Sequence, residues 1–319
     1  MKTMKRIKTL LAICAISIFS ITAVNAQDIA AATELYNNGA KMLGEKNYTA
    51  AIESFSKAMK MAEGLGEEGA TIVKDSKGII PKIYLAFGQD LASQKKVDES
   101  IAQLKLAIEA SKAAGLADVE KSATELIPQV LMVGANDLFA AEKYAEAIAA
   151  YKKVAEVDAN NAKIYFYTGV SESRLGNEAG AIAAFEKAIA LGDKEDSPKQ
   201  ISNIYLKKAA NAIKTKNYAD VYASAKKSNE YVASSQAAKL LGIGAFNLKK
   251  YDEAIAAIDS YISLEPAAKD KNGMFYYLAQ AYEAKKNPAK ACGYYKQLMA
   301  DPTYKQIAEY KVKTELKCK

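Results

Sequence analysis

The sequence contains no histidine. Without histidine the chain cannot build a Ser-His-Asp or Cys-His nucleophile, or a zinc site with histidine ligands. It also has no GxxxxGK segment followed by Ser or Thr, a common phosphate-binding pattern. We therefore expect no enzyme, no metal and no cofactor, although carboxylate, lysine or serine chemistry stays open to the chain.

Cysteine and arginine are scarce. The cysteines are Cys14, Cys292 and Cys318, and the arginines are Arg6 and Arg174. A four-cysteine metal site is therefore impossible. Bidentate contacts to phosphate and guanine depend on arginine, so we expect no nucleic-acid partner.

Residues 1–26 have the order of an export signal. Basic residues come first, an apolar run extends from Leu10 to about Ile21, and Val24 and Ala26 are the short residues before a cut. We expect cleavage after Ala26 and a soluble periplasmic or secreted protein without a membrane span. An uncleaved anchor is the alternative, although the run is shorter than the ~18 apolar residues of a typical span. Cleavage removes four of the 44 basic residues and none of the 37 acidic ones, which lowers the formal net charge from +7 to +3.

One unit recurs seven times. The segment KYAEAIAAYKKVA, which starts at Lys143, aligns with segments that start at Asn47, Lys96, Asn177, Asn217, Lys250 and Asn287. Three columns follow one helix face. The first column is small: Ala51, Ser100, Ala147, Ala181, Val221, Ala254, Ala291. The second is mostly large: Phe55, Leu104, Tyr151, Phe185, Ala225, Ile258, Tyr295. The third is Ala58, Ala107, Val154, Ala188, Ser228, Tyr261, Leu298.

A further small column precedes each segment by eight residues, inside a helical pattern of its own. It consists of Gly39, Gly88, Ala135, Gly169, Ala209, Gly242 and Ala279. The unit is therefore a helix, a short turn and a second helix. Small residues on both helices let the two backbones approach closely, and the larger residue fills the space beside them.

This pattern resembles the tetratricopeptide repeat family, whose 34-residue unit has the same small and aromatic positions. Tyr48, Tyr144, Tyr218 and Tyr251 match the tyrosine of the family's turn, whereas Val97, Glu178 and Pro288 do not. The resemblance implies an all-α, right-handed superhelical solenoid of about seven antiparallel helix pairs over residues 27–302, the first three lengthened. Residues 303–319 are expected to form a C-terminal capping helix and tail.

Two prolines mark the lengthened units. Pro81 and Pro128 each precede a small-column residue by seven positions. Proline suits the first turn of a helix, so we expect an N-terminal extension that begins near each proline or kinks there.

In this family the first helices line a groove that binds partners. Carried over to this sequence, that face is Tyr36, Leu43, Leu85, Met132, Phe139, Phe166, Leu206, Ile213, Ile243, Phe246 and Tyr276. The set is mostly apolar, which suits an amphipathic helix or an apolar peptide if the groove is open. The alternative is that neighbouring repeats bury these residues. Arg174 stands alone, so the carboxylate-gripping role of some family members is not expected.

Cys292 and Cys318 are candidates for a disulfide that ties the cap to the last repeat. Cys292 occupies a column that holds isoleucine in five other copies, and Cys318 follows the cap helix. A buried thiol at Cys292 and a frayed tail at Cys318 are the alternative.

The sequence therefore favours a non-catalytic scaffold or adaptor of the cell envelope that binds a protein or peptide partner, whose identity it does not give. Two other classes stay open: a glycan- or peptidoglycan-binding module that uses exposed tyrosines, and a carboxylate hydrolase, for which Glu172 is the single acidic residue in a suitable column. The many lysines beside the turns indicate a solvated surface more than a site for polyanions.

Overall fold

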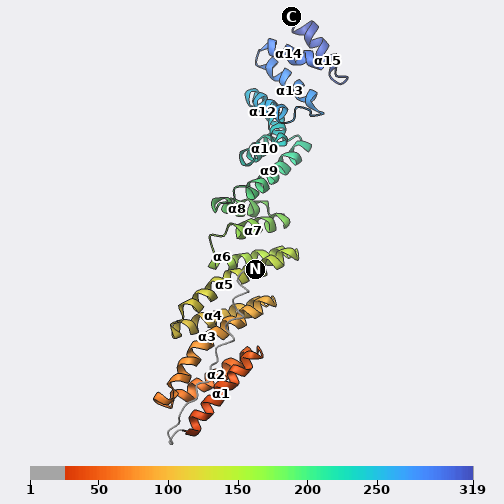
Figure 1. Ribbon diagram of the computed structural model, residues 1–319. Coiled ribbons are helices and arrows are strands. Elements are labelled where there is room, and N and C mark those ends of the chain that lie inside the picture. The colour runs from red at the N-terminus through yellow and green to blue at the C-terminus, as the bar shows by residue number, and fades with distance from the viewer. Residues whose placement is uncertain (1–25, 319) are drawn as a thin grey trace. The chain divides into compact units, whose positions relative to one another are not determined.

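The computed structural model of the chain describes residues 26–318, and the export signal predicted for residues 1–26 lies, apart from Ala26, outside them (Figure 1). The described part consists of helices and their connections, without strands. It forms two compact units that divide between Ala159 and Asn160.

Seven helix pairs follow one another along residues 26–298, and consecutive helices in each unit are antiparallel (Figure 1). The first helices are α1 (Ala26–Gly44), α3 (Ala70–Ser93), α5 (Ala117–Ala140), α7 (Ala162–Arg174), α9 (Asp196–Lys214), α11 (Ser235–Asn247) and α13 (Lys271–Ala284). The second helices are α2 (Tyr48–Glu63), α4 (Val97–Ala114), α6 (Tyr144–Val157), α8 (Glu178–Ala190), α10 (Tyr218–Tyr231), α12 (Tyr251–Leu264) and α14 (Pro288–Leu298). A 3-10 turn, η3 (Gly66–Gly69), precedes α3. The all-α fold of helix pairs is confirmed.

The predicted columns form the interior of every pair. All members of the small column on the first helices and of the three columns on the second helices are buried. The contact between them is close: a methyl group on Gly169 would lie 2.7 Å from a ring carbon of Phe185. One on Gly242 would lie 2.6 Å from Ile258. Glycine is therefore the residue that lets a large side chain of the second helix reach the first helix backbone.

The copy formed by α9 and α10 has alanine at two facing positions: Ala209 in the small column of the first helix and Ala225 in the mostly large column of the second. Leu240 of α11 packs into this cluster and fills the volume that an aromatic residue occupies in other copies. The two backbones α10 and α11 approach closely here, since a methyl group on Gly244 would lie 2.8 Å from the backbone nitrogen of Tyr222. A neighbouring helix thus completes the interior of this pair.

The two prolines lie in the middle of helices, so the predicted N-terminal extensions are present but do not begin near either proline. Helices α3 and α5 begin at Ala70 and Ala117, 11 residues before Pro81 and Pro128. An interior proline destabilises a helix by about 3 kcal/mol. Packing of the early turns offsets this, because Ile72 lies in a cluster with α2 and Ala123 in one with α4. Lengthened first helices are also not confined to the first three pairs, since α9 has 19 residues, as many as α1.

The turn inside each pair places one residue in the left-handed region. Lys46, Lys95, Glu142, Lys216, Lys249 and Lys286 have φ between 55° and 62°, and Gly176 has φ 82°. The next residue caps the second helix, and where it is asparagine its side chain accepts a hydrogen bond from the helix backbone, as Asn177 does from Gly180 at 3.1 Å. Side chains other than glycine are strained in this conformation by roughly 1–2 kcal/mol.

The C-terminal segment covers the last pair. It consists of α15 (Lys305–Tyr310) and the π-helical turn η4 (Lys311–Glu315). Ala308 and Val312 are buried in one cluster with Tyr295 and Leu298 of α14. The Nζ of Lys311 donates to Glu283 of α13 at 2.6 Å and to Glu315 at 2.7 Å. The position is that of the expected cap.

Cys292 and Cys318 are joined by a disulfide, with their Cα atoms 5.7 Å apart. Cys292 lies on α14 and Cys318 lies just beyond η4, so the bond ties the cap to the last pair. Burial raises the pKa of Glu283, but hydrogen bonds from Lys311 and Tyr295 outweigh it and lower that pKa below its ordinary value. A covalent bond and an ion pair therefore hold the cap at two places.

Replacing the close-contact glycine Gly169 by alanine is expected to destabilise the protein by about 1–3 kcal/mol, because the methyl group overlaps the ring of Phe185. Gly293 on α14 is the matched control, since a methyl group there meets no atom within 4 Å. Gly293→Ala should stabilise the helix by about 0.5–1 kcal/mol. Chemical denaturation of both variants measures this, and equal effects would contradict the packing argument.

Lys216→Gly, Lys249→Gly and Lys286→Gly should each raise the free energy of unfolding by about 0.5–1 kcal/mol, the relief of left-handed strain less the added flexibility of glycine. Lys207, an exposed lysine inside α9, provides the comparison. Lys207→Gly should destabilise the chain by about 1 kcal/mol. Thermal denaturation compares the four variants, and a loss of stability in the turn variants would refute the strain.

Removing the disulfide in a Cys292→Ser, Cys318→Ser variant is expected to lower the free energy of unfolding by about 3 kcal/mol, since the bond closes a loop with a sequence separation of 26. Wild-type protein treated with a reductant should behave like the variant. Two free thiols in a mass spectrum of the unreduced protein would show that the bond does not form.

Candidate protein-binding face

The eleven residues predicted for the groove are partly buried, and none is exposed. Ile243 is buried, and the others are half-buried: Tyr36, Leu43, Leu85, Met132, Phe139, Phe166, Leu206, Ile213, Phe246 and Tyr276. They therefore form the floor of the first-helix face and do not project from it.

Helix geometry explains this burial. A residue three positions before the small column, or four positions after it, lies one turn away on nearly the same side of the helix. Such a residue packs against the second helix of its own pair. The ring of Tyr36 contacts that of Phe55 at 5.0 Å, and the ring of Phe166 lies 5.8 Å from that of Phe185.

The residues four positions after the small column pack on the turn tyrosines. Phe139 contacts Tyr144 and Phe246 contacts Tyr251, each edge to face with ring centroids 5.8 Å apart. Phe246 also contacts Tyr277 of the next first helix at 4.9 Å. The apolar floor thus continues from α11 to α13.

Exposed residues, most of them polar, flank this floor. The residues six positions before the small column are exposed in six copies: Thr33, Lys82, Gln129, Lys163, Asn203 and Gln236. The residues five positions after it are exposed in all seven: Gly44, Ser93, Ala140, Arg174, Lys214, Asn247 and Ala284. The sequence prediction missed these columns because it followed the apolar positions of the face. The same periodicity points to them, since both lie beside the floor on the exposed side of the first helix.

The tyrosines serve mainly as internal contacts. Among those of residues 26–318, only Tyr310 is exposed, at 52%. Burial and the hydrogen bond to Glu186 raise the pKa of Tyr231 to about 12, and burial together with the bond to Asp270 does the same for Tyr261. These hydroxyls are engaged within the fold, and no observation favours the glycan-binding alternative.

The acidic residue considered for a hydrolase is also engaged. Glu172 accepts a hydrogen bond from the side chain of Asn177 at 2.9 Å. Across the described chain, no group of three His, Cys, Asp or Glu side chains could hold a metal ion. Nor does any helix between residues 26 and 318 have the length and apolarity needed to cross a membrane.

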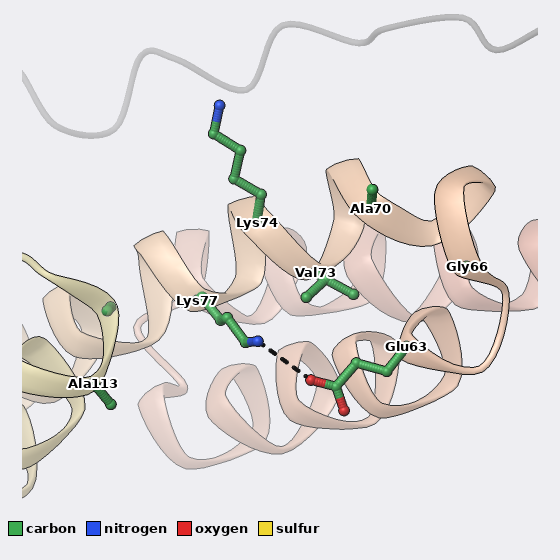
Figure 2. A pocket seen from close by; sticks show the side chains of 8 residues that line it. Glu63, Gly66, Ala70, Val73, Lys74, Lys77 and Ala113 are labelled. Carbon is green, nitrogen blue, oxygen red and sulfur yellow. Dashed lines mark ion pairs between the residues drawn. The ribbon is translucent and has the colours of Figure 1, made fainter.

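One open cavity, of about 540 Å³, lies between the end of α2, the start of α3 and the end of α4 (Figure 2). Its walls include Val73, Ala70 and Ala113, and the Nζ of Lys77 lies 3.4 Å from a carboxylate oxygen of Glu63. Both charged side chains are about half exposed. The cavity therefore lacks the converging buried polar groups that define a ligand site.

Two stretches of the chain match the family described as tetratricopeptide repeat, residues 133–196 and 274–303. The first contains the pair α7 and α8, and the second contains most of α13 and all of α14. No curated protein matches the chain.

Several solved structures are similar in fold. One is YrrB, a TPR protein described as having an unusual peptide-binding site, with 20% identity over 56% of this chain and 90% of its own, and a TM-score of 0.33. MamA from Desulfovibrio magneticus RS-1 has 18% identity over 54% of this chain and 93% of its own, with a TM-score of 0.31. The TPR domain of P58(IPK) has 18% identity over 90% of this chain and 98% of its own, with a TM-score of 0.29. Likenesses of this degree carry no information about the partner of this chain.

Proposed function

This chain is a tetratricopeptide repeat protein, and we propose that it is a non-catalytic scaffold of the cell envelope that holds a polypeptide partner on the face of its first helices. The family's architecture serves protein interaction, and the helix pairs described above provide it. One observation carries the finer proposal: in each unit a half-buried apolar floor lies on the first helices between columns of exposed, mostly polar residues.

Within the second unit this arrangement is clearest on α9 and α11, which contact each other. Leu206 and Ile213 form floor positions on α9, and Ile213 packs into the cluster of Ile243 from α11. Asn203 and Gln236 are exposed beside them. An apolar side chain of a partner would cover the floor, while the polar column would hydrogen-bond its backbone or polar side chains.

Two features support a place in the envelope. The first is the signal-like order of residues 1–26, which predicts a periplasmic or secreted protein. The second is the disulfide between Cys292 and Cys318, a bond that persists in oxidising compartments.

A photo-activated cross-linking amino acid at Asn203 or Gln236 should capture the same partner from both positions. The matched controls are Ala223 on α10 and Ala256 on α12, which are exposed on second helices. Exposed positions are chosen because changes to the half-buried floor would disturb the helix pair itself. Mass spectrometry of the adducts measures the result, and we expect yields at least several-fold lower from the controls. Equal capture from both faces, or none from Asn203 and Gln236, would contradict the proposed face.

A further inference from the structure

The turns inside the four pairs of the second unit lie along one edge. We call this the turn edge and define it as residues 174–178, 214–220, 247–253 and 284–290. Antiparallel pairs that stack in order must end all their first helices on the same side. Contacts between neighbouring pairs agree with this, since Lys285 is paired with Asp252 of the preceding copy and the hydroxyl of Tyr222 donates to Glu253 of the following one.

Positive charge is in excess on the turn edge. Within the described chain, these exposed cations have no carboxylate partner: Arg174, Lys214, Lys216, Lys249 and Lys286. The carboxylates of the same edge are all engaged. Glu178 pairs with Lys208, Asp220 accepts from Asn217, Asp252 pairs with Lys285, and Glu253 accepts from Tyr222 and Lys250.

Three of these cations are kept in a strained backbone conformation. Lys216, Lys249 and Lys286 have φ of 56°, 61° and 55°. Gly176 holds the equivalent place in the first turn with φ 82°, so the turn accepts glycine. In the second unit every residue other than glycine at this place is therefore a lysine with an unpaired positive charge, whereas the first unit has Glu142 and the paired Lys95 there.

Two leucines stand among these charges. Leu175 is 52% exposed and Leu248 is 37% exposed, and each directly precedes a left-handed residue. A soluble polyanion would gain little from them. Exposed leucine beside lysine is instead the composition of surfaces that lie at a bilayer interface, where the apolar side chain enters the headgroup region and the cations meet anionic lipids.

The first unit has no such edge. Its left-handed residues include Glu142 as well as Lys46 and Lys95, and Lys95 is paired with Asp137 at 2.8 Å. The excess of unpaired cations and the exposed leucines are thus a property of the second unit.

We propose that the turn edge of the second unit docks the protein on the surface of a bilayer that contains anionic phospholipids. Lysines without a built pocket suit a diffuse layer of negative headgroups, to which each contributes through its charge alone. The binding is peripheral and is weakened by salt. It does not depend on the polypeptide-binding role proposed for the first-helix face.

The test is co-sedimentation of the protein, purified as the cell produces it, with phosphatidylcholine vesicles that contain or lack phosphatidylglycerol. Wild-type protein should bind only the anionic vesicles. A triple variant with Lys216→Gly, Lys249→Gly and Lys286→Gly should bind on the order of a hundredfold more weakly, at about fivefold per lysine. The same variant should unfold at a higher temperature than wild type, so lost binding cannot be ascribed to lost folding.

The matched control removes three exposed lysines near the opposite edge, with Lys194→Gln and Lys269→Gln in connections between pairs and Lys305→Gln at the start of α15. It should keep nearly all of the binding, although its net charge is the same as that of the triple variant. Leu175→Ser with Leu248→Ser should weaken vesicle binding several-fold and leave retention on a heparin column unchanged. Equal losses in control and triple variant would overturn the proposal, as would wild-type protein that binds heparin but no anionic vesicle.

Discussion

The contact between a glycine or alanine of the first helix and a large side chain of the second is the interaction on which the whole structure depends. It sets the distance between the helices of each pair, because no atom beyond a hydrogen or a methyl group stands between the backbone and a ring such as that of Phe185 or Tyr295. The half-buried floor exists because aromatic residues one turn away lean on the same second helix. The turns are short because helices this close must be connected tightly. Each turn consists of three residues, and the one in the left-handed conformation reverses the chain.

Charge and apolar surface are divided between two parts of the molecule. The first-helix face is apolar at its floor and mostly polar at its borders, as a surface that binds a polypeptide would be. The turn edge of the second unit carries unpaired cations and exposed leucines. The two proposed roles share Arg174 and Lys214, but the floor residues and the lysines Lys216, Lys249 and Lys286 belong to one role each, so one role can be removed while the other is retained.

The helix pairs and their interior could be predicted from the sequence because packing of small against large residues is local and repeats in every copy. The beginnings of α3 and α5 could not. Proline at position 81 or 128 is typical of a first turn, and only the contacts of Ile72 and Ala123 with preceding helices reveal eleven earlier helical residues. The left-handed lysines were also beyond prediction, since lysine has no preference for that conformation and nothing in its type announces it. For the candidate face, the sequence located the floor but not the polar columns beside it.

The pair α9 and α10 differs from the others in a way that limits how far the chain is modular. Its interior contains facing alanines and a buried hydrogen bond between Ser202 and Ser228, and Leu240 from α11 fills the remaining volume. Most pairs could in principle end a shortened chain once a polar cap was supplied. A chain that ended after α10 would in addition need a residue to fill the space that Leu240 occupies. Other pairs also take buried residues from the next first helix, as the first pair does from Ile80 and Ile83 of α3. Insertion or recombination between consecutive pairs of one unit would therefore disrupt a shared cluster, and at the fifth pair it would also remove the side chain that completes the interior.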